Sequence, residues 1–153
     1  MKKIAVIGYG MMGSCHVGAL QALGYPVFMV MGRDIDRTKK FAAAHGIKHA
    51  TTDFKDIVEA GVEVVHVCTP PVRHYPLVRR ALEQGMHVIC EKPFVFDETE
   101  GEELVRLALE KNVINAVGFN VRFHGACRDA RTMVRKKELG QILLVNGSYM
   151  QEF

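Results

Sequence analysis

Short apolar runs alternate with longer segments of helical spacing along almost the whole chain. The apolar runs are continuous rather than interrupted by alternating polar residues, which is typical of strands that are covered on both faces. When strands and helices alternate, right-handed crossovers place the helices on both faces of a parallel sheet. The sequence therefore predicts an α/β fold with a doubly wound parallel sheet, whose functional loops lie at the carboxyl ends of the strands.

The expected elements follow from this alternation. We expect strands over residues 3–7, 26–31, 47–50, 63–69, 86–93, 113–120 and 140–150. We expect helices over residues 12–23, 34–46, 53–60, 70–85, 97–112 and 121–138. Asp97 with Glu100 fits a capping box at the start of one helix. In the first helix, the residues at helical spacing are Met12, His16, Ala19, Leu20 and Leu23.

The stretch "GYGMMG" directly follows the first predicted strand and opens the first predicted helix. Gly8 permits the tight turn, Gly10 leaves no side chain between the backbone and a pyrophosphate, and Gly13 lets the helix pack against the strand. The amino end of the helix then faces the phosphates. In this context the pattern predicts a dinucleotide site, which also includes Met11 and Met12 between the glycines.

Two other interpretations of residues 7–20 compete with this one. Lysines before an apolar run imitate a secretion signal, but the three glycines interrupt the run. Cys15 and His16 are neighbours on a helix, so their side chains point in different directions and no nearby pair completes a zinc site. We therefore predict no metal site, treat both as ordinary helix residues, and expect His66 to serve packing or solvent contact.

The residues after the second strand bear on which dinucleotide binds. An NAD enzyme typically places an acidic side chain there to bond the ribose 2′-hydroxyl. Gly32 stands where the acid is expected, and Arg33 follows it. A small residue leaves room for a 2′-phosphate, which an arginine can bind through two hydrogen bonds. We therefore expect NADP as the preferred cofactor, with NAD as the alternative if Asp34 serves as the acid after a shift of register.

Charge, hydrophobicity and cysteine content limit the classes of partner and the cellular location that we expect. The net charge is only +3 and the 20 lysines and arginines are spread along the chain, so we expect no nucleic-acid partner. No apolar run approaches the length of about 18 residues that would cross a bilayer, so we expect no membrane partner. The four cysteines form no C-x-x-C pair, which indicates reduced thiols and a cytoplasmic location.

Three further stretches follow later strands: "CTPPVRHYP" at 68–76, "EKP" at 91–93 and "GFNVRF" at 118–123. Together with the glycine turn, they resemble the amino-terminal half of the Gfo/Idh/MocA family, which includes glucose–fructose oxidoreductase and inositol dehydrogenase. The similarity covers essentially all 153 residues in order, and the E-K-P motif after a strand is its most specific part. It implies a Rossmann domain that binds NAD or NADP.

The resemblance also implies roles for single residues. Thr69, Pro70 and His74 match the T-P…H loop beside the nicotinamide half of the cofactor, and Glu91 matches the acidic member of the E-K pair. Lys92 matches the lysine that lies near the reacting carbon, holds the substrate hydroxyl and the nicotinamide ribose, and takes part in proton transfer. Because a lysine at the carboxyl end of a strand can stabilise a developing alkoxide, Lys92 is the predicted catalytic residue.

The last matching motif marks the passage between two domains. Asn120 and Arg122 match the N-x-R-F stretch that leads from the cofactor domain into the substrate domain, and we count both among the cofactor-binding residues. The usual proline after this stretch is His124 here, which leaves the start of the next helix open. We place the dinucleotide-binding domain at residues 1–120, and a linking helix with the first strand of a substrate domain at residues 121–153.

Members of the family are longer than this chain, and their second half is an α+β domain that supplies the substrate pocket and much of the oligomer interface. Residues 140–150 resemble the first strand of that domain. We therefore expect the chain to be a fragment or a truncated gene product that keeps cofactor binding without full activity. An apolar strand without neighbours needs cover, either from the helices of the Rossmann domain or from another chain, and a homo-oligomer formed through the strand would provide the latter.

The predicted function is that of the NAD(P)-binding part of an oxidoreductase. Hydride would pass between nicotinamide and a small-molecule substrate, namely a sugar, a polyol or a related carbonyl compound, while Lys92 polarises the substrate oxygen. A catalytically silent dinucleotide-binding module that acts as a sensor or subunit is the alternative. A nucleotide-binding methyltransferase would have no use for the E-K-P motif at this place.

Overall fold

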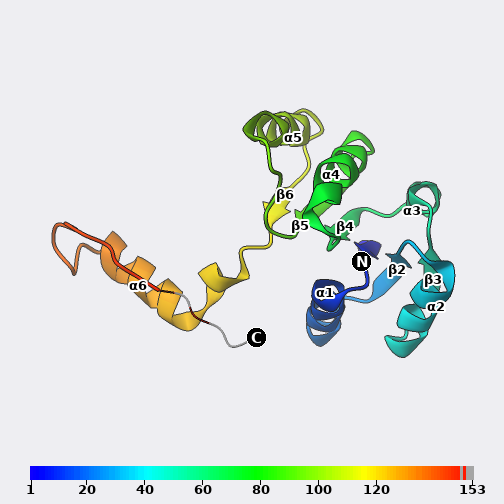
Figure 1. Cartoon of the computed structure of the whole chain (residues 1–153), viewed down its shortest axis with the longest axis horizontal. Coiled ribbons are helices and arrows are strands. Elements are labelled where there is room, and N and C mark those ends of the chain that lie inside the picture. Colours follow the sequence, from blue (N-terminus) through cyan, green and yellow to red (C-terminus); the bar gives the residue numbers. More distant parts are fainter. Residues whose placement is uncertain (149, 151–153) are drawn as a thin grey trace. The chain divides into compact units, whose positions relative to one another are not determined.

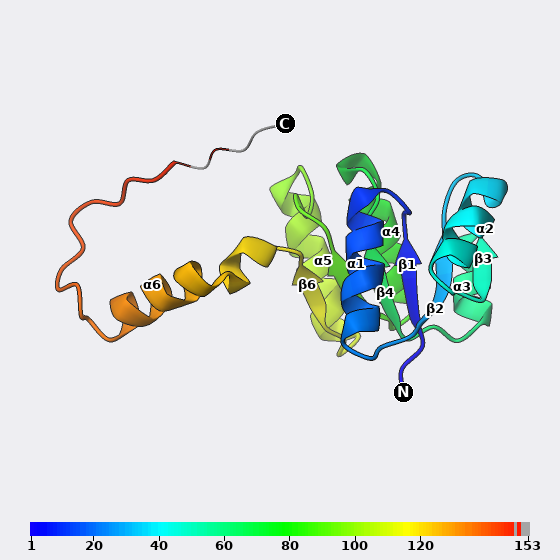
Figure 2. The same ribbon diagram turned by 90° about the horizontal axis from the view of Figure 1, so that it is seen from below.

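The computed structural model describes residues 1–148 and residue 150. The chain divides into two compact units, Met1–Gly118 and Phe119–Phe153, and the first is built around a six-stranded sheet (Figures 1 and 2). Its strands are β1 (Ile4–Ile7), β2 (Val27–Met31), β3 (His49–Thr51), β4 (Val64–Val67), β5 (His87–Cys90) and β6 (Asn115–Val117). Its helices are α1 (Met11–Ala22), α2 (Ile35–Ala44), α3 (Phe54–Glu59), α4 (His74–Glu83) and α5 (Glu98–Glu110). Nowhere in the described part of the chain is a helix both long and apolar enough to span a membrane.

Neighbouring strands of the sheet pair in parallel, in the order β3-β2-β1-β4-β5-β6. The chain adds β2 and β3 on one side of β1, and then crosses to the other side to add β4, β5 and β6. In an open α/β sheet, such a switch point between β1 and β4 creates a crevice at the carboxyl ends of the strands. The predicted α/β fold with a doubly wound parallel sheet is confirmed.

Helices cover both faces of the sheet. Figure 1 shows α1 and α2 on one side, with α4 and α5 on the other. Alternate residues of β1 serve the two faces, because Val6 packs in one cluster with Val17 of α1 and Ala42 of α2. Ala5 and Ile7 pack in the second and larger cluster, which includes residues of α3, α4 and α5. This burial on both faces explains why the strands are continuous apolar runs in the sequence.

Three helices begin with an aspartate that caps their amino ends. The carboxylates of Asp34, Asp53 and Asp97 accept hydrogen bonds from backbone amides in the first turns of α2, α3 and α5. Each such cap stabilises a helix by about 1 kcal/mol. Helix α1 differs, because its capping position is Gly10, which makes no side-chain cap, and its first turn holds no acidic residue. The first amides of α1 therefore have no capping side chain.

The residue after each of several strands continues the pairing by one more backbone hydrogen bond. These bonds join Gly8 N to Met31 O at 2.8 Å, Cys68 N to Ile7 O at 2.8 Å, Glu91 N to Val67 O at 2.9 Å and Gly118 N to Cys90 O at 2.8 Å. The loops that carry the predicted site residues of the first unit thus leave the sheet along one fixed edge.

The second unit begins with a 3₁₀ turn, Asn120–Phe123, followed by α6 (Gly125–Arg135). The sequence predicts one helix over residues 121–138, so the helical stretch is shorter and is interrupted at His124, whose backbone is extended. All described side chains of this unit are exposed.

The strand predicted over residues 140–150 is wrong for the described part of that range, because residues 140–148 and 150 form no strand. A strand requires a neighbour whose backbone groups pair with its own, and the described sheet ends at β3 and β6 without pairing to this stretch. Leu143, Leu144 and Val145 are 86%, 83% and 84% exposed. Tyr149 of the predicted strand lies outside the described residues.

Candidate cofactor site at the carboxyl edge of the sheet

The glycine turn joins β1 to α1 at the switch point of the sheet. Gly8 has a φ of 101°, which favours glycine, and a Cβ there would lie 2.7 Å from the carbonyl oxygen of Cys68. A Cβ on Gly13 would lie 2.0 Å from the carbonyl oxygen of Gly8, whereas a Cβ on Gly10 would meet no atom within 4 Å. Two glycines are therefore required by the turn itself, and the third leaves open space beside the backbone.

Met11 and Met12 form the first turn of α1. Met11 is 78% exposed, and Met12 packs partly against the cluster that contains Val6. The amide of Ser14 donates to the carbonyl of Gly10 at 3.0 Å. The amides before Ser14 are those that helix geometry leaves without an intrahelical partner. Backbone amides of this kind at a helix amino end attract anions.

The loop after β4 lies against the glycine turn. The Cβ built on Gly8 would lie 3.1 Å from the backbone amide of Thr69. The side-chain oxygen of Thr69 is buried and has no hydrogen-bond partner among the described residues. A buried hydroxyl without a partner is unfavourable by about 1–3 kcal/mol, so a ligand that bonds it would relieve this cost. Pro70 follows and precedes the 3₁₀ turn Pro71–Arg73.

His74 links the loop after β4 to the loop after β5. The residue is fully buried, its Nδ1 lies 2.7 Å from the carbonyl oxygen of Pro93, and its Nε2 lies 2.8 Å from the carbonyl oxygen of Thr69. Both partners only accept, so the ring donates to both when it is doubly protonated. The ring nitrogens of His74 thus face the backbone of the two loops, and His74 joins these loops together.

Glu91 and Lys92 follow β5 and differ in exposure. Glu91 is 5% exposed, whereas Lys92 is an exposed residue. The backbone amide of Lys92 donates to Oε2 of Glu91 at 3.3 Å. A Cβ on Gly118 would lie 2.5 Å from Oε1 of Glu91, so the glycine after β6 makes room for the buried carboxylate. The lysine is therefore available at the edge of the sheet while the glutamate is held inside.

Two histidines that the sequence analysis leaves without a role contact this carboxylate. Nε2 of His16 lies 3.0 Å from Oε1 of Glu91, and its Nδ1 lies 2.9 Å from Nδ1 of His66 in β4. The expectation of an ordinary helix residue at 16 is wrong, whereas the packing expected of His66 is confirmed and the hydrogen bond to His16 adds to it. Spacing along the chain does not show contacts between α1, β4 and the turn after β5, but a histidine inside the apolar run "VVHVC" is a signal that could have found them.

Two buried thiols lie at the ends of β4 and β5. Burial, followed by the charge of Glu91, raises the pKa of Cys68 to about 12. Burial, followed by the neighbouring Cys68, raises the pKa of Cys90 to about 12. Both thiols therefore stay protonated at neutral pH and act as small apolar groups.

The ring of Tyr9 occupies the space beside Gly32 at the end of β2. A Cβ on Gly32 would lie 2.0 Å from Cε1 of Tyr9 and 2.4 Å from the hydroxyl oxygen of Thr38. The guanidinium of Arg37 lies over the same ring, 5.6 Å from its centroid. Tyr9 therefore fills the space that any side chain at position 32 would need.

Arg33 and Asp34 follow this glycine. Arg33 is exposed. The carboxylate of Asp34 accepts from the backbone amide of Arg37 at 2.9 Å, as the cap of α2. Asp34 thus has a structural use in its observed position.

The site residues predicted for the first unit gather along one sheet edge, but two others belong elsewhere. Asn120 and Arg122 lie in the 3₁₀ turn of the second unit, where both are exposed. Their part in the site stays a prediction.

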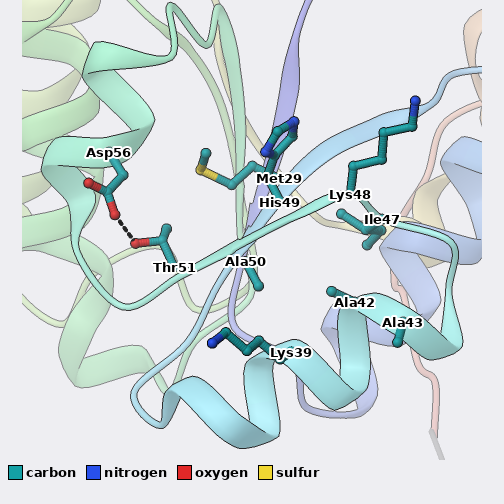
Figure 3. A pocket seen from close by; sticks show the side chains of 10 residues that line it. All are labelled: Met29, Lys39, Ala42, Ala43, Ile47, Lys48, His49, Ala50, Thr51 and Asp56. Atoms are coloured by element: carbon teal, nitrogen blue, oxygen red, sulfur yellow. Dashed lines mark hydrogen bonds between the residues drawn. The ribbon is translucent and has the colours of Figure 1, made fainter.

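A pocket of about 500 Å³, separate from the predicted cofactor site, lies beside the edge strand β3 (Figure 3). Its described lining comes from β2, α2, β3 and the segments next to them: Met29, Lys39, Ala42, Ala43, Ile47, Lys48, His49, Ala50, Thr51 and Asp56. None of these residues belongs to the predicted site. The hydroxyl of Thr51 donates to the carboxylate of Asp56, so this polar pair is already satisfied.

Comparisons with known proteins agree with this geometry. A model of an oxidoreductase family with an NAD-binding Rossmann fold matches residues 2–119. Levoglucosan dehydrogenase from Pseudarthrobacter phenanthrenivorans is 28% identical, and the match covers 98% of this chain and 41% of that protein.

Solved structures give the same picture. UDP-N-acetylglucosamine 3-dehydrogenase GnnA from Acidithiobacillus ferrooxidans is 28% identical with a TM-score of 0.78, over 85% of this chain and 41% of that one. GenD2 from gentamicin A biosynthesis, in complex with NAD, is 27% identical with a TM-score of 0.83, over 90% and 40%. The chain thus spans about 40% of the length of these relatives. Since the family model matches well over half of the chain, the chain belongs to the Gfo/Idh/MocA family of oxidoreductases with an NAD-binding Rossmann fold.

Proposed function

We propose that this chain is the NAD(P)-binding part of an oxidoreductase that transfers hydride between nicotinamide and a sugar- or polyol-like substrate. The observation that carries the proposal is the glycine turn, where Gly10 leaves open space beside the uncapped amino end of α1 at the switch point of the sheet. Because the chain spans about 40% of its relatives' length, the activity and substrate of the whole protein are part of the proposal.

Several features of the carboxyl edge support a bound dinucleotide. The buried hydroxyl of Thr69, which has no partner among the described residues, lies next to the glycine turn and would bond the cofactor. Pro70 would line the same region, and His74 would hold this loop against the turn after β5. The residues that would hold the pyrophosphate are Gly8, Gly10, Met11, Met12 and Gly13.

Lys92 is the residue that we assign to the chemistry. A bound nicotinamide cofactor supplies or accepts the hydride. The ammonium of Lys92, exposed after β5, would stabilise the negative charge that develops on the substrate oxygen. Glu91 would orient the backbone of this lysine, and Asn120 and Arg122 remain predicted cofactor-binding residues. The names of levoglucosan dehydrogenase and UDP-N-acetylglucosamine 3-dehydrogenase support a carbohydrate substrate.

We also propose that NADP is preferred over NAD. Tyr9 fills the space that an acidic side chain at Gly32 would need, and Asp34 is bonded as a helix cap. Arg33 and Arg37 stand at the amino end of α2, where a 2′-phosphate on the cofactor would be recognised. The NAD complex of GenD2 supports NAD as the alternative.

A titration of the purified chain with NADPH and NADH, read by nicotinamide fluorescence and by thermal shift, tests the proposal. Gly10→Ala is the test variant and Gly18→Ala its matched control, because a methyl group meets open space at both positions. We expect the Kd for NADPH to rise about tenfold in Gly10→Ala, since the methyl group would displace a phosphate from charge-assisted hydrogen bonds. Gly18→Ala should bind like the wild type.

Three outcomes would contradict parts of this proposal. Unchanged binding by Gly10→Ala would remove the glycine turn from the site. Tighter binding of NADH than of NADPH would refute the cofactor preference. Failure of the wild type to bind either nucleotide would refute the cofactor site altogether.

A further inference from the structure

Three side chains from three separate segments meet inside the first unit. The rings of His16 and His66 pack edge to face, with centroids 5.2 Å apart and planes at 87°. The side chains of His16 and Glu91 are 15% and 7% exposed, and His66 is 6% exposed. Water therefore has little access to this cluster, and its polar atoms depend on one another for hydrogen bonds.

The distances constrain where the ring protons lie. An ionised carboxylate only accepts, so Nε2 of His16, 3.0 Å from Glu91, carries a hydrogen. The two Nδ1 atoms are 2.9 Å apart, so one of them donates and the other accepts. Burial, followed by the neighbouring His16, lowers the pKa of His66 to about 4, so His66 carries a single ring proton at pH 7. If that proton is on Nδ1, His66 is the donor in this bond and Nδ1 of His16 is the acceptor.

We propose that His66 and His16 are positioning residues, which form a directed hydrogen-bond chain to Glu91. Nδ1–H of His66 donates to Nδ1 of His16, and Nε2–H of His16 donates to Oε1 of Glu91. These hydrogen bonds join β4 and α1 to the turn that carries Lys92.

The hydrogen-bond chain from His66 to Glu91 acts on Lys92 through the two carboxylate oxygens of Glu91. Oε1 of Glu91 is held by His16, while Oε2 accepts from the backbone amide of Lys92 at 3.3 Å. Gly118 leaves the space that this carboxylate occupies. Fixing the carboxylate on the side of α1 therefore fixes the backbone from which the lysine extends. These hydrogen bonds are independent of the proposed function, whereas their importance for Lys92 in a reaction rests on it.

The tautomers of the two histidines are the direct test. In the whole chain labelled with ¹⁵N-histidine, long-range ¹H–¹⁵N correlation spectra at pH 7 distinguish protonated from unprotonated ring nitrogens. We expect a proton on Nε2 alone in His16 and on Nδ1 alone in His66. A proton on Nε2 of His66, or on both nitrogens of His16, would overturn the directed chain. This measurement needs no variant beyond those used to assign the signals.

Variants of His16 test whether the chain positions Lys92. His16→Leu removes both bonds at similar size, whereas His16→Gln keeps one donor and one acceptor on the same side chain. We expect hydrogen exchange of the Lys92 amide to become about fivefold faster in His16→Leu and to return toward the wild-type rate in His16→Gln. His49→Leu, at an exposed histidine on the edge strand, is the matched control and should leave this amide unchanged.

The two proposals fail separately. Equal exchange of the Lys92 amide in the wild type and His16→Leu would refute the positioning role, whatever the nucleotide titration shows. A chain that binds no nucleotide but shows the expected tautomers and exchange rates would refute the proposed function and keep the hydrogen-bond chain.

Discussion

At the scale of single residues, Tyr9 and Gly32 form a matched pair across the ends of β1 and β2. The ring and the missing side chain occupy the same space, since a Cβ on Gly32 would lie 2.0 Å from the ring. A side chain at position 32 therefore cannot be introduced without displacing this ring. The guanidinium of Arg37 lies over the face of the same ring.

The pair predicts how cofactor preference can be altered. Gly32→Asp alone should destabilise the chain by about 1–3 kcal/mol, because the new side chain collides with the ring. The double variant Tyr9→Ala with Gly32→Asp should recover part of that stability, since the collision with the Thr38 hydroxyl remains, and bind NADH more tightly relative to NADPH. Urea unfolding and the two nucleotide titrations measure these effects. Equal stability of Gly32→Asp and the wild type would refute the steric coupling.

His66 predicts how stability depends on pH. Burial lowers its pKa from 6.5 to about 4 in the folded chain, so between these values the unfolded chain binds more protons than the folded one. Stability contributed by neutral His66 is therefore complete above about pH 6.5 and is lost as the pH falls toward 4, by at most about 3 kcal/mol.

Urea unfolding at pH 7.5, 6.0 and 5.0 measures this loss. The variant His66→Gln should show a smaller fall in the free energy of unfolding over this range, and His49→Gln should keep the wild-type fall. The same pH dependence in His66→Gln and the wild type would assign the effect to other groups.

At the scale of elements, the start of α2 separates two neighbouring roles. Asp34→Ala should lower the free energy of unfolding by about 1 kcal/mol, because the amide of Arg37 loses its acceptor, and should leave the ratio of NADPH to NADH affinity unchanged. Arg33→Ala should lower NADPH affinity selectively and leave stability unchanged, since Arg33 is exposed. Denaturant unfolding and nucleotide titration of both variants test this division. A shift in the affinity ratio in Asp34→Ala would show that Asp34 contacts the cofactor.

The order and type of the elements in the first unit could be predicted from the sequence, because burial on both faces makes each strand a continuous apolar run. The packing of single helices could not. Leu23 fits the apolar spacing of α1 but is 74% exposed, whereas Val17 is fully buried. The close approach of Gly13 to Gly8 turns α1 against the sheet, and this approach depends on backbone contacts that spacing does not reveal.

The candidate site also has parts that could be predicted from the sequence and parts that could not. The glycine turn could be predicted, since its residues are adjacent in sequence and each has a steric reason. The contacts among His16, His66 and Glu91 could not, because they join residues from three distant segments. The predicted strand over 140–150 failed for a related reason, as strand formation depends on a partner and not on apolar content alone.

At the scale of the whole molecule, the buried residues are distributed unevenly along the chain. Every residue that is buried among the described ones lies between Ile4 and Ala108. A chain ending at Gly118 should therefore unfold within about 3 °C of the full chain. Thermal unfolding by circular dichroism provides the test. A midpoint lower by about 10 °C would show that residues after Gly118 stabilise the first unit.

The four cysteines differ in exposure, so two of them can be labelled selectively. Cys68 and Cys90, with pKa values near 12, hold too little thiolate at neutral pH to react with maleimides, whereas Cys15 and Cys127 are exposed. One reactive thiol thus lies on α1 of the first unit and the other on α6 of the second. Spin labels attached to these two thiols would measure the distance between α1 and α6 in solution, with and without nucleotide, and would need no engineered residue.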